Sequence, residues 1–416
     1  MSQLIVQVCR IDKIEDLENA QRLQMATVKG WQTLVGKDQH HVGELVIYIP
    51  PDSVVPQNLI DALKLEYLRE HNGRLRTIKL RGYISQGLIL SFGQFVDANL
   101  VDNIQPSGSN VFVDSTFKRP ILLDGEYKEG DDVGEALGIK KYEVPQKSIA
   151  GPRKEYIRDY WKKLLAHEIT LRRFVAKSVG IIKTRLRKPK LTNEHFKVYT
   201  DINNVKHYPN IFEPGEHVIV TEKIHGTNFR VGNLPVKQTF LNKLFKKSGY
   251  EFCYGSHRVQ KTALSGKGWY GEDVYGQIAA RYNLKDVIPN GYVLYGEIYG
   301  PKIQKMVYGM KEIDVVFFDL QINGNYVDYQ IFKDFCDLAK LPTVPVLFNG
   351  QLDEGTLRLC TDGKTTIGND KNQIREGCVI KPITEKLDPR AGRKILKSIS
   401  AEYLLTKDED NAEFSH

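Results

Sequence analysis

The chain has 416 residues and a formal net charge of +8, with 41% hydrophobic and 26% charged residues, which is the balance of an ordinary globular protein of two or three domains. No stretch approaches the roughly 18 apolar residues that a membrane helix needs. The N-terminus has no basic segment before a long apolar run, so we expect no signal peptide.

The first 100 residues read as short strands separated by turns. Segments 30–36, 43–51 and 76–92 are rich in β-branched and aromatic residues and are bounded by glycine or proline. Several strands at this spacing predict a small β-barrel.

A basic segment follows a polar, proline-containing stretch. Residues 153–190 contain thirteen Lys or Arg and only three acidic residues, so most of the net charge is concentrated there. Ile157, Trp161, Leu164 and Leu165 share one face of a predicted helix over 153–188, which Pro189 ends. The segment is either a solvated helical connector or a surface that neutralises phosphates of a nucleic acid.

The remaining chain alternates between strands and helices. We predict strands at 216–223, 292–300, 314–324 and 377–382, helices at 283–287 and 330–342, and a frayed acidic tail at 406–416. The five cysteines are scattered and never form a CxxC pair, which argues against a disulfide framework and a zinc site. We therefore expect a reducing compartment, the cytoplasm or nucleus of a cell, with a virus-encoded origin left open.

The string from Thr221 to Asn228, TEKIHGTN, is the most informative. The strand at 216–223 delivers Lys223, and Gly226 permits a close approach of the backbone to a ligand. A lysine at a strand end beside a phosphate can act as a nucleophile once its ammonium has lost a proton. A KxxG sequence alone occurs often by chance.

This string resembles the nucleotide-attachment motif of the RNA ligase branch of the covalent nucleotidyltransferases, which includes phage-type and kinetoplastid editing ligases. Five further segments resemble the later motifs of that family in the same order: 255–258 (GSHR), 295–305 (YGEIYGPKIQK), 315–319 (VVFFD), 376–382 (EGCVIKP) and 394–399 (KILKSI). The N-terminal half is similar to the OB module of Deinococcus-type RNA ligases.

The resemblance implies an α+β fold class: an OB-like β-barrel followed by an antiparallel-sheet, ATP-grasp-like nucleotidyltransferase domain. The expected divisions are an OB-like nucleic-acid-binding domain at 1–144, a basic connector at 145–195, the ligase domain at 196–405 and the tail. It also implies an ATP-dependent RNA ligase whose partner is RNA with 3′-OH and 5′-phosphate ends. Nicked duplex RNA and an RNA/DNA hybrid are both candidate substrates, repair of nicked RNA is the leading one, and we expect a monomer.

On the phosphate side, the resemblance implies that Lys223 attacks ATP to form lysyl-AMP, from which AMP passes to the RNA 5′-phosphate before a 3′-OH seals the joint. Lys381 and Lys397 would contact the α-phosphate. His225 and Asn228 would orient the pyrophosphate or the hydration shell of a metal, although His225 is also a candidate for bracing the loop.

On the nucleoside side, Glu222 would accept a hydrogen bond from the adenine amino group, and Arg258 and Glu297 would hold the ribose hydroxyls. Phe318 would stack on adenine. Phe317 is its rival, because successive residues of a strand face opposite ways.

Glu376 would contact the Mg²⁺ or Mn²⁺ ion, directly or through water. The fifth motif departs from the family pattern. The family has two lysines that are two residues apart, but in this chain the residue two positions after Lys397 is Ile399. Lys394 faces the opposite way in a straight strand and reaches the site only through a bulge. Few residues follow Lys397, so the N-terminal module would grip the RNA in place of the further domain of phage-type relatives.

Other functions remain open at this point. A DNA ligase or a GTP-using capping enzyme shares the KxxG skeleton but reads KxDG. A non-catalytic RNA-binding protein would have a degenerate site, which the intact Lys223, Glu297, Glu376 and Lys381 argue against.

Overall fold

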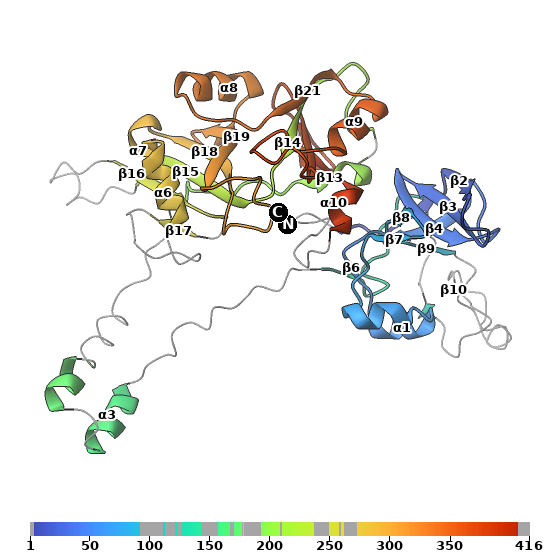
Figure 1. The fold of residues 1–416 in the computed structure, drawn as a ribbon, viewed down its shortest axis with the longest axis horizontal. Coiled ribbons are helices and arrows are strands. Elements are labelled where there is room, and N and C mark those ends of the chain that lie inside the picture. The colour runs from blue at the N-terminus through green and yellow to red at the C-terminus, as the bar shows by residue number, and fades with distance from the viewer. Residues whose placement is uncertain are drawn as a thin grey trace. The chain divides into compact units, whose positions relative to one another are not determined.

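The computed structural model describes residues 4–91, 111–112, 121–122, 127–142, 157–166, 170–176, 178, 193–208, 210–236, 249–257, 259–261 and 273–406 (Figure 1). Contacts divide the chain into two units, one made of Met1–Tyr142 with His195–His416 and the other of Glu143–Glu194. The predicted acidic tail lies, apart from Thr406, outside the described residues.

The N-terminal part is built from short antiparallel sheets, as the sequence predicts. Two three-stranded sheets have the orders β1-β5-β9 and β2-β3-β4, and shorter pairs join β12 to β6, β7 to β8 and β10 to β11. Trp31 and Tyr48, whose rings lie 5.8 Å apart, belong to the core under these sheets. The elements are β1 Gln7–Arg10, β2 Lys13–Asp16, β3 Leu23–Val28, β4 Trp31–Gly36, β5 Leu45–Ile49, β6 Ser53–Val54, α1 Gln57–Ala62, η1 Glu66–His71, β7 Ile78–Leu80, β8 Tyr83–Ser85, β9 Leu88–Ser91, β10 Val111–Phe112, β11 Ile121–Leu122 and β12 Lys140–Lys141.

The C-terminal part contains two larger sheets. A five-stranded sheet has the order β13-β25-β22-β14-β21, and a six-stranded sheet has the order β17-β16-β15-β18-β19-β20. All pairs are antiparallel except β13 with β25. The elements of both sheets, with η2 and the β23-β24 pair, are β13 Asn203–Asn204, η2 Val205–His207, β14 His217–Lys223, β15 Thr227–Pro235, β16 Tyr250–Gly255, β17 Gln260–Lys261, β18 Tyr292–Tyr299, β19 Asp314–Ile322, β20 Asn325–Tyr326, β21 Val346–Gln351, β22 Gly377–Pro382, β23 Leu387–Asp388, β24 Gly392–Arg393 and β25 Leu396–Ile399.

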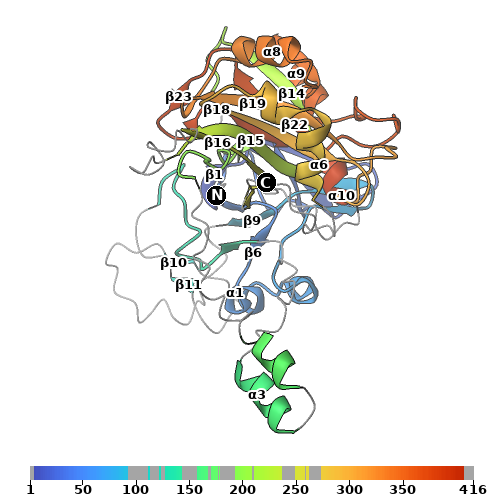
Figure 2. The ribbon, with the colours of Figure 1, turned by 90° about the vertical axis from the view of Figure 1, so that its left-hand side faces the viewer.

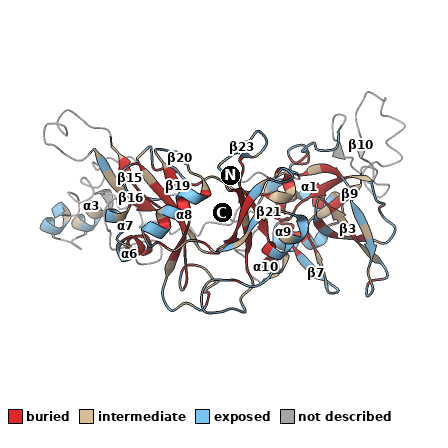
Figure 3. Ribbon diagram, turned by 90° about the horizontal axis from the view of Figure 1, so that it is seen from above, coloured by how far each residue is buried: buried red, intermediate tan, exposed pale blue. Residues whose placement is uncertain are grey.

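Helices α6 Val274–Arg281, α8 Tyr329–Leu338 and α9 Glu354–Thr361 pack against these sheets (Figure 2), as does the short α7 Leu284–Val287. The last helix in the described part of the chain, α10 Ala401–Leu405, follows β25 and places Tyr403 against His225. Phe332 of α8 is fully buried against Phe317 and Leu320 of β19, while the outward face of α8 is exposed (Figure 3). The sequence predicts α7 and α8 but not α6, α9 or α10. α6 and α9 each contain a glycine, Gly276 and Gly355, which lowers helix propensity, and α10 has only five residues.

The second unit contains α3, Ile157–Leu165. Trp161 packs edge-on against Phe174 with ring centres 5.4 Å apart, yet it remains 51% exposed, and Leu165 is 64% exposed. The apolar helix face expected from the sequence is therefore mostly uncovered within the described part of this unit. Much of the predicted helix beyond α3 lies outside the described residues.

No helix in the described ranges is both long enough and apolar enough to cross a membrane.

Candidate functional site

The two large sheets are connected where the TEKIHGTN string runs. Lys223 ends β14 of the five-stranded sheet, and Thr227 begins β15 of the six-stranded sheet. A pocket lies between the sheets, with about 910 Å³ of empty space that includes some open solvent.

Gly226 allows the crossing between the sheets to be tight. A Cβ at this position would lie 2.2 Å from the Ile298 carbonyl oxygen and 3.0 Å from the Glu297 side chain. Any larger residue would push β15 away from β18, so glycine is required by close packing here.

Lys223 reaches from the end of β14 toward the adjacent strand β22. Its Nζ donates to the Glu376 carboxylate at 2.6 Å, and the two side chains are 10% and 1% exposed. A buried carboxylate thus holds this pocket lysine in one position. The two residues are 153 positions apart, so the sequence alone does not show that they are in contact.

His225 lies behind Lys223 and is fixed by two tyrosines. The Tyr308 hydroxyl accepts the His225 backbone N–H at 2.7 Å, and the Tyr403 hydroxyl lies 3.0 Å from the ring Nδ1. The same ring nitrogen is 3.8 Å from Glu376. His225 is buried and does not line the pocket, which favours the bracing role over contact with the pyrophosphate.

One side of the pocket has apolar walls. Phe318 lines it and makes an edge contact with Tyr199 at 4.9 Å, whereas Phe317 is fully buried in the core on the other face of β19. Ile224, Val379 and Ile395 add further apolar lining. A planar base fits beside such a surface.

Glu222 lines the pocket, but its carboxylate already has partners. The hydroxyls of Thr365 and Thr366 donate to it, and the Thr366 backbone N–H donates at 2.8 Å. Since a carboxylate offers about four acceptor positions, roughly one is left for an adenine amino group.

Asn228 and Glu297 face each other across β15 and β18 and both line the pocket. The Asn228 Oδ1 is buried without a hydrogen bond to any described residue. Burial raises the pKa of Glu297 to about 8, with Lys223 opposing and Glu376 adding to the shift. Both groups are suited to hydroxyls of a ligand, because a buried polar atom is stable only when it is paired.

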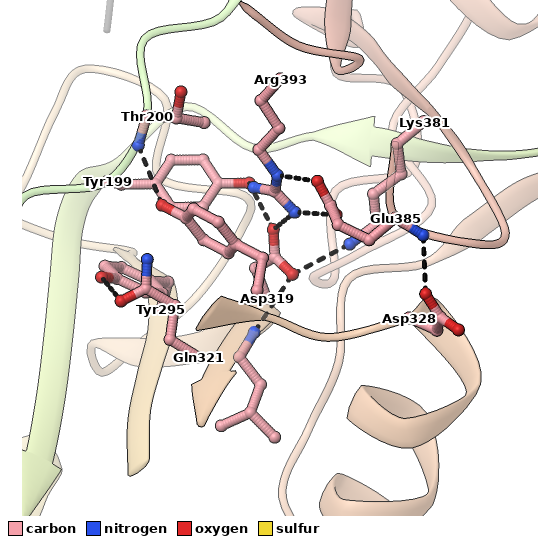
Figure 4. A network of polar contacts seen from close by, with 11 residues as sticks. Tyr199, Thr200, Tyr295, Asp319, Gln321, Asp328, Lys381, Glu385 and Arg393 are labelled. Carbon is pink, nitrogen blue, oxygen red and sulfur yellow. Dashed lines mark hydrogen bonds and ion pairs between the residues drawn. The ribbon is translucent and has the colours of Figure 1, made fainter. Parts of the chain in front are cut away.

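Asp319 is the centre of a buried ion network (Figure 4). Its carboxylate accepts hydrogen bonds from Lys381 at 3.0 Å and the Tyr199 hydroxyl at 2.7 Å, and pairs with Arg393 at 2.7 Å. Arg393 also forms a two-bond pair with Glu385 at 2.6 Å. Burial acts to raise the pKa of Asp319, but Lys381 and Arg393 outweigh it and hold that pKa below its usual value.

Lys381 and Lys397 both line the pocket and are buried, at 6% and 2% exposure. Lys394 does not line it; this residue precedes β25, and its Nζ pairs with Glu216 at 2.6 Å. The possibility that a bulge brings Lys394 into the site is therefore wrong. Ile395, two residues before Lys397, takes the inward position.

The metal assignment has a limited basis in this arrangement. No group of three or more His, Cys, Asp or Glu in the described ranges could hold a metal ion. Glu376 therefore offers one carboxylate and not a complete ligand set.

Arg258, which the sequence places at the ribose, lies outside the described residues.

Several residues of the site have no signal in the sequence motifs. Tyr199, Thr200, Asp201 and Ile202 line the pocket from the segment that precedes β13. Thr365, Thr366, Arg393, Tyr308 and Tyr403 contact predicted site residues from distant parts of the chain. Asp319 directly follows Phe318 within a motif, so the sequence could have singled it out beside Lys381, which it did predict.

Comparison with known proteins identifies two regions. Residues 216–399 match the family model described as RNA ligase, and residues 5–92 match the model of an OB-fold domain. The search of curated proteins found no match.

Structures of Naegleria gruberi RNA ligase share the fold over nearly the whole chain. A mutant without ligand is 21% identical with a TM-score of 0.60, covering 97% of this chain and 98% of that one. Mutants with ATP and Mn and with AMP and Mn are each 20% identical with TM-scores of 0.61 and the same coverage. The predicted fold class, an OB-like domain followed by an antiparallel-sheet ligase domain, is confirmed.

Proposed function

Because residues 216–399 form an RNA ligase domain, we propose that the chain is an ATP-dependent RNA ligase that acts through lysyl-AMP on Lys223. The observation that carries the proposal is the position of Lys223 in the pocket wall, beside buried Glu376 and facing the same pocket as Lys381 and Lys397. The Naegleria gruberi enzyme, which shares the fold, has structures with ATP and Mn and with AMP and Mn.

In the first step the Lys223 nitrogen attacks the α-phosphorus of ATP. A nitrogen–phosphorus bond forms, the bond to the bridging oxygen breaks, and pyrophosphate leaves. The ammonium must first lose a proton, and Glu376 at 2.6 Å is placed to accept it. Lys381 and Lys397 stabilise the charge that develops on the phosphate oxygens.

In the next two steps a 5′-phosphate oxygen of the RNA displaces Lys223 from the AMP phosphorus, and a 3′-OH then displaces AMP. The same phosphate site serves each in-line transfer. Asp319 and Arg393 hold Lys381 in place for all three, since the amine is bonded to Asp319 at 3.0 Å.

The apolar side of the pocket would take adenine against Phe318, with Glu222 accepting from its amino group. Asn228 and Glu297 would pair with the ribose hydroxyls, and Arg258 would join them by the family motif. This division follows the lining of the pocket, which is apolar near Phe318 and charged near Lys223.

A divalent cation, Mg²⁺ or Mn²⁺, fits the site when it arrives with ATP. Magnesium is commonly bound by one or two carboxylates together with substrate phosphates, so Glu376 would hold it, directly or through water. The bound ion would neutralise phosphate charge during transfer.

The RNA substrate is the least determined part of the proposal. Ends bearing 3′-OH and 5′-phosphate follow from the chemistry, and sealing of nicks in duplex RNA or an RNA/DNA hybrid by a monomer is the case we favour. The motif series supports a relationship to phage-type, kinetoplastid and Deinococcus-type ligases. The basic segment 153–190 is proposed to add RNA affinity through its charge.

The direct test is incubation with α-³²P-labelled ATP or GTP and a divalent metal, followed by a denaturing gel. A covalent label from ATP alone supports the proposal. A label from GTP alone moves the protein to the capping class, and no label from folded protein makes a non-catalytic RNA-binding function the better one.

We propose that Tyr403 positions His225 for the first step, and Tyr403→Phe tests this. The change keeps the ring packing and removes the hydroxyl 3.0 Å from Nδ1. A hydrogen bond of this kind contributes about 0.5–1.5 kcal/mol, so we expect lysine adenylylation to slow by about 3- to 10-fold with little change in the KM for ATP.

The control for Tyr403 is Tyr254→Phe, which removes another buried hydroxyl, bonded to Asp273 at 3.0 Å. Tyr403→Phe should have no further effect in a His225→Ala background, because contacting residues are non-additive. An equal effect in both backgrounds would show that Tyr403 acts independently of His225.

The raised pKa of Glu297 predicts a pH-dependent stability in the absence of nucleotide and metal. Between its ordinary value of 4.5 and about 8, the folded state binds more protons at Glu297 than the unfolded state does. The free energy of unfolding should therefore fall as pH rises through this window, by on the order of 1–4 kcal/mol. Urea unfolding at several pH values measures it.

Glu297→Gln should flatten that dependence, while Glu312→Gln, at a carboxylate whose side chain is 79% exposed, should leave it unchanged. An unchanged slope in Glu297→Gln would mean that another group titrates.

A further inference from the structure

The hairpin of β7 and β8 in the OB-like part exposes an unusual mixture of side chains. Ile78 and Leu80 are each 45% exposed, and all three residues of β7 are exposed. In the register of the hairpin, Leu80 lies opposite Tyr83 and Ile78 opposite Ser85. Residues directly opposite each other share a face, so Ile78, Leu80 and Tyr83 form one apolar face of the ribbon.

Positive charge lies next to this face and behind it: Arg81 is in the turn at its end, and Lys79, between Ile78 and Leu80, is on the opposite face of the ribbon. Residues 71–91 contain no acidic residue. Arg74 is bound to Asp52, whereas Arg76, Lys79 and Arg81 form no ion pair within the described part of the chain. An apolar ribbon edged with cations matches the combination of phosphates and base or sugar surfaces that nucleic acids present.

The turn holds one of these cations at the tip. Arg81 has φ 51° and Gly82 φ 90°, the left-handed pair of a two-residue hairpin turn. Asparagine adopts the first of these positions more readily than arginine does. Arg81, with its exposed guanidinium, is therefore not the residue that the left-handed backbone conformation of this turn position favours.

We propose that this hairpin binds the RNA substrate, with Lys79 and Arg81 on phosphates and with Ile78, Leu80 and Tyr83 against bases or riboses. The proposal rests on RNA being the substrate. RNA phosphates compensate the cations of the hairpin, whereas a second copy of the chain would bring the same cations against them, so the concentrated charge favours RNA.

The test measures binding of the full chain to a fluorescent RNA duplex whose nick carries a 5′-hydroxyl, so that it cannot be sealed. Anisotropy is followed across a salt series. We expect Lys79→Gln with Arg81→Asn to weaken binding by about 10-fold at low salt and to reduce the slope of log affinity against log salt by about 1 to 2. Asn keeps the turn geometry, so the unfolding temperature should not fall.

The apolar face is tested separately by Ile78→Thr and Leu80→Thr, which place β-branched residues in the strand. Affinity should fall by about 5-fold or more with an unchanged salt slope, because no charge is lost. Matched controls are Lys340→Asn, at a lysine whose φ of 55° is close to that of Arg81, and Leu387→Thr, another leucine in a short ribbon, 82% exposed. Neither control should change RNA binding.

Binding equal to that of the controls in all four hairpin changes would overturn the proposal. So would a change in oligomeric state on size-exclusion chromatography with light scattering, which would identify the face as a contact between copies. Lysine adenylylation of the wild type without RNA reports on the proposed function independently. Its absence, with hairpin-dependent RNA binding intact, would remove the ligase proposal alone.

Discussion

Lys223→Ala is expected to lose covalent labelling by α-³²P-labelled ATP, by at least about 10³-fold, because the attacking nitrogen is removed. Lys381 and Lys397 also line the pocket, but Lys381 is bonded to Asp319 and cannot move to the α-phosphorus without breaking a buried ion pair. The measurement is a denaturing gel after incubation with labelled nucleotide.

Lys223→Arg is the matched variant for this prediction. A guanidinium keeps a positive charge beside Glu376, which is 1% exposed, but is not a nucleophile at neutral pH. Both variants should still join RNA that is already adenylylated, since that step does not use the lysine nitrogen. A labelled Lys223→Arg protein would show that a different residue carries the AMP.

Asp319→Asn is expected to lower the stability of the protein more than any other single substitution of a site residue. The substitution is nearly isosteric, but it leaves Lys381 and Arg393, 8% and 6% exposed, without the carboxylate that compensates both. Breaking a buried pair in this way costs about 3–5 kcal/mol. For a protein of this size, we expect the unfolding temperature to fall by roughly 3–6 °C, with adenylylation reduced because Lys381 is displaced.

Glu216→Gln is the control for Asp319→Asn, because Glu216 also accepts from two lysines, Lys394 and Lys386, at 2.6 and 2.9 Å. Lys386 is 48% exposed and can be solvated instead, so the loss should be smaller. Adding Lys381→Met to Asp319→Asn should recover part of the lost stability without recovering activity. If Glu216→Gln and Asp319→Asn lowered the free energy of unfolding equally, the larger loss expected from breaking the buried network around Asp319 would be contradicted.

Strand alternation accounts for the site residues that could be predicted correctly in position. Phe318 faces the pocket and Phe317 the core because they are consecutive in β19. Lys397 lies within β25 and lines the pocket, whereas Lys394 precedes that strand and pairs with Glu216. The relation between the two phenylalanines needs only the period of a strand, which the sequence contains.

Contacts between distant segments could not be predicted in this way. Thr365 and Thr366 bind Glu222 from more than 140 residues away, and Tyr403 reaches His225 across 178 positions. Such pairs depend on how the two sheets and their loops meet, and no periodicity within either segment encodes that. These contacts determine how many hydrogen bonds the Glu222 carboxylate can still accept. They also fix the position of the His225 ring.

The sequence by itself determined the strands that carry the motifs, because these follow from local pattern. It determined the fold class and Lys223 as the candidate nucleophile through the resemblance of its motif series to RNA ligases, because those motifs are local and their order along the chain is visible without a structure. The tertiary structure alone decided which buried charges neutralise one another around Asp319, which carboxylate holds Lys223, and that the β7–β8 hairpin presents an apolar face edged with cations. Burial and ion pairing are properties of neighbours in space, and the packing of the folded chain determines those neighbours.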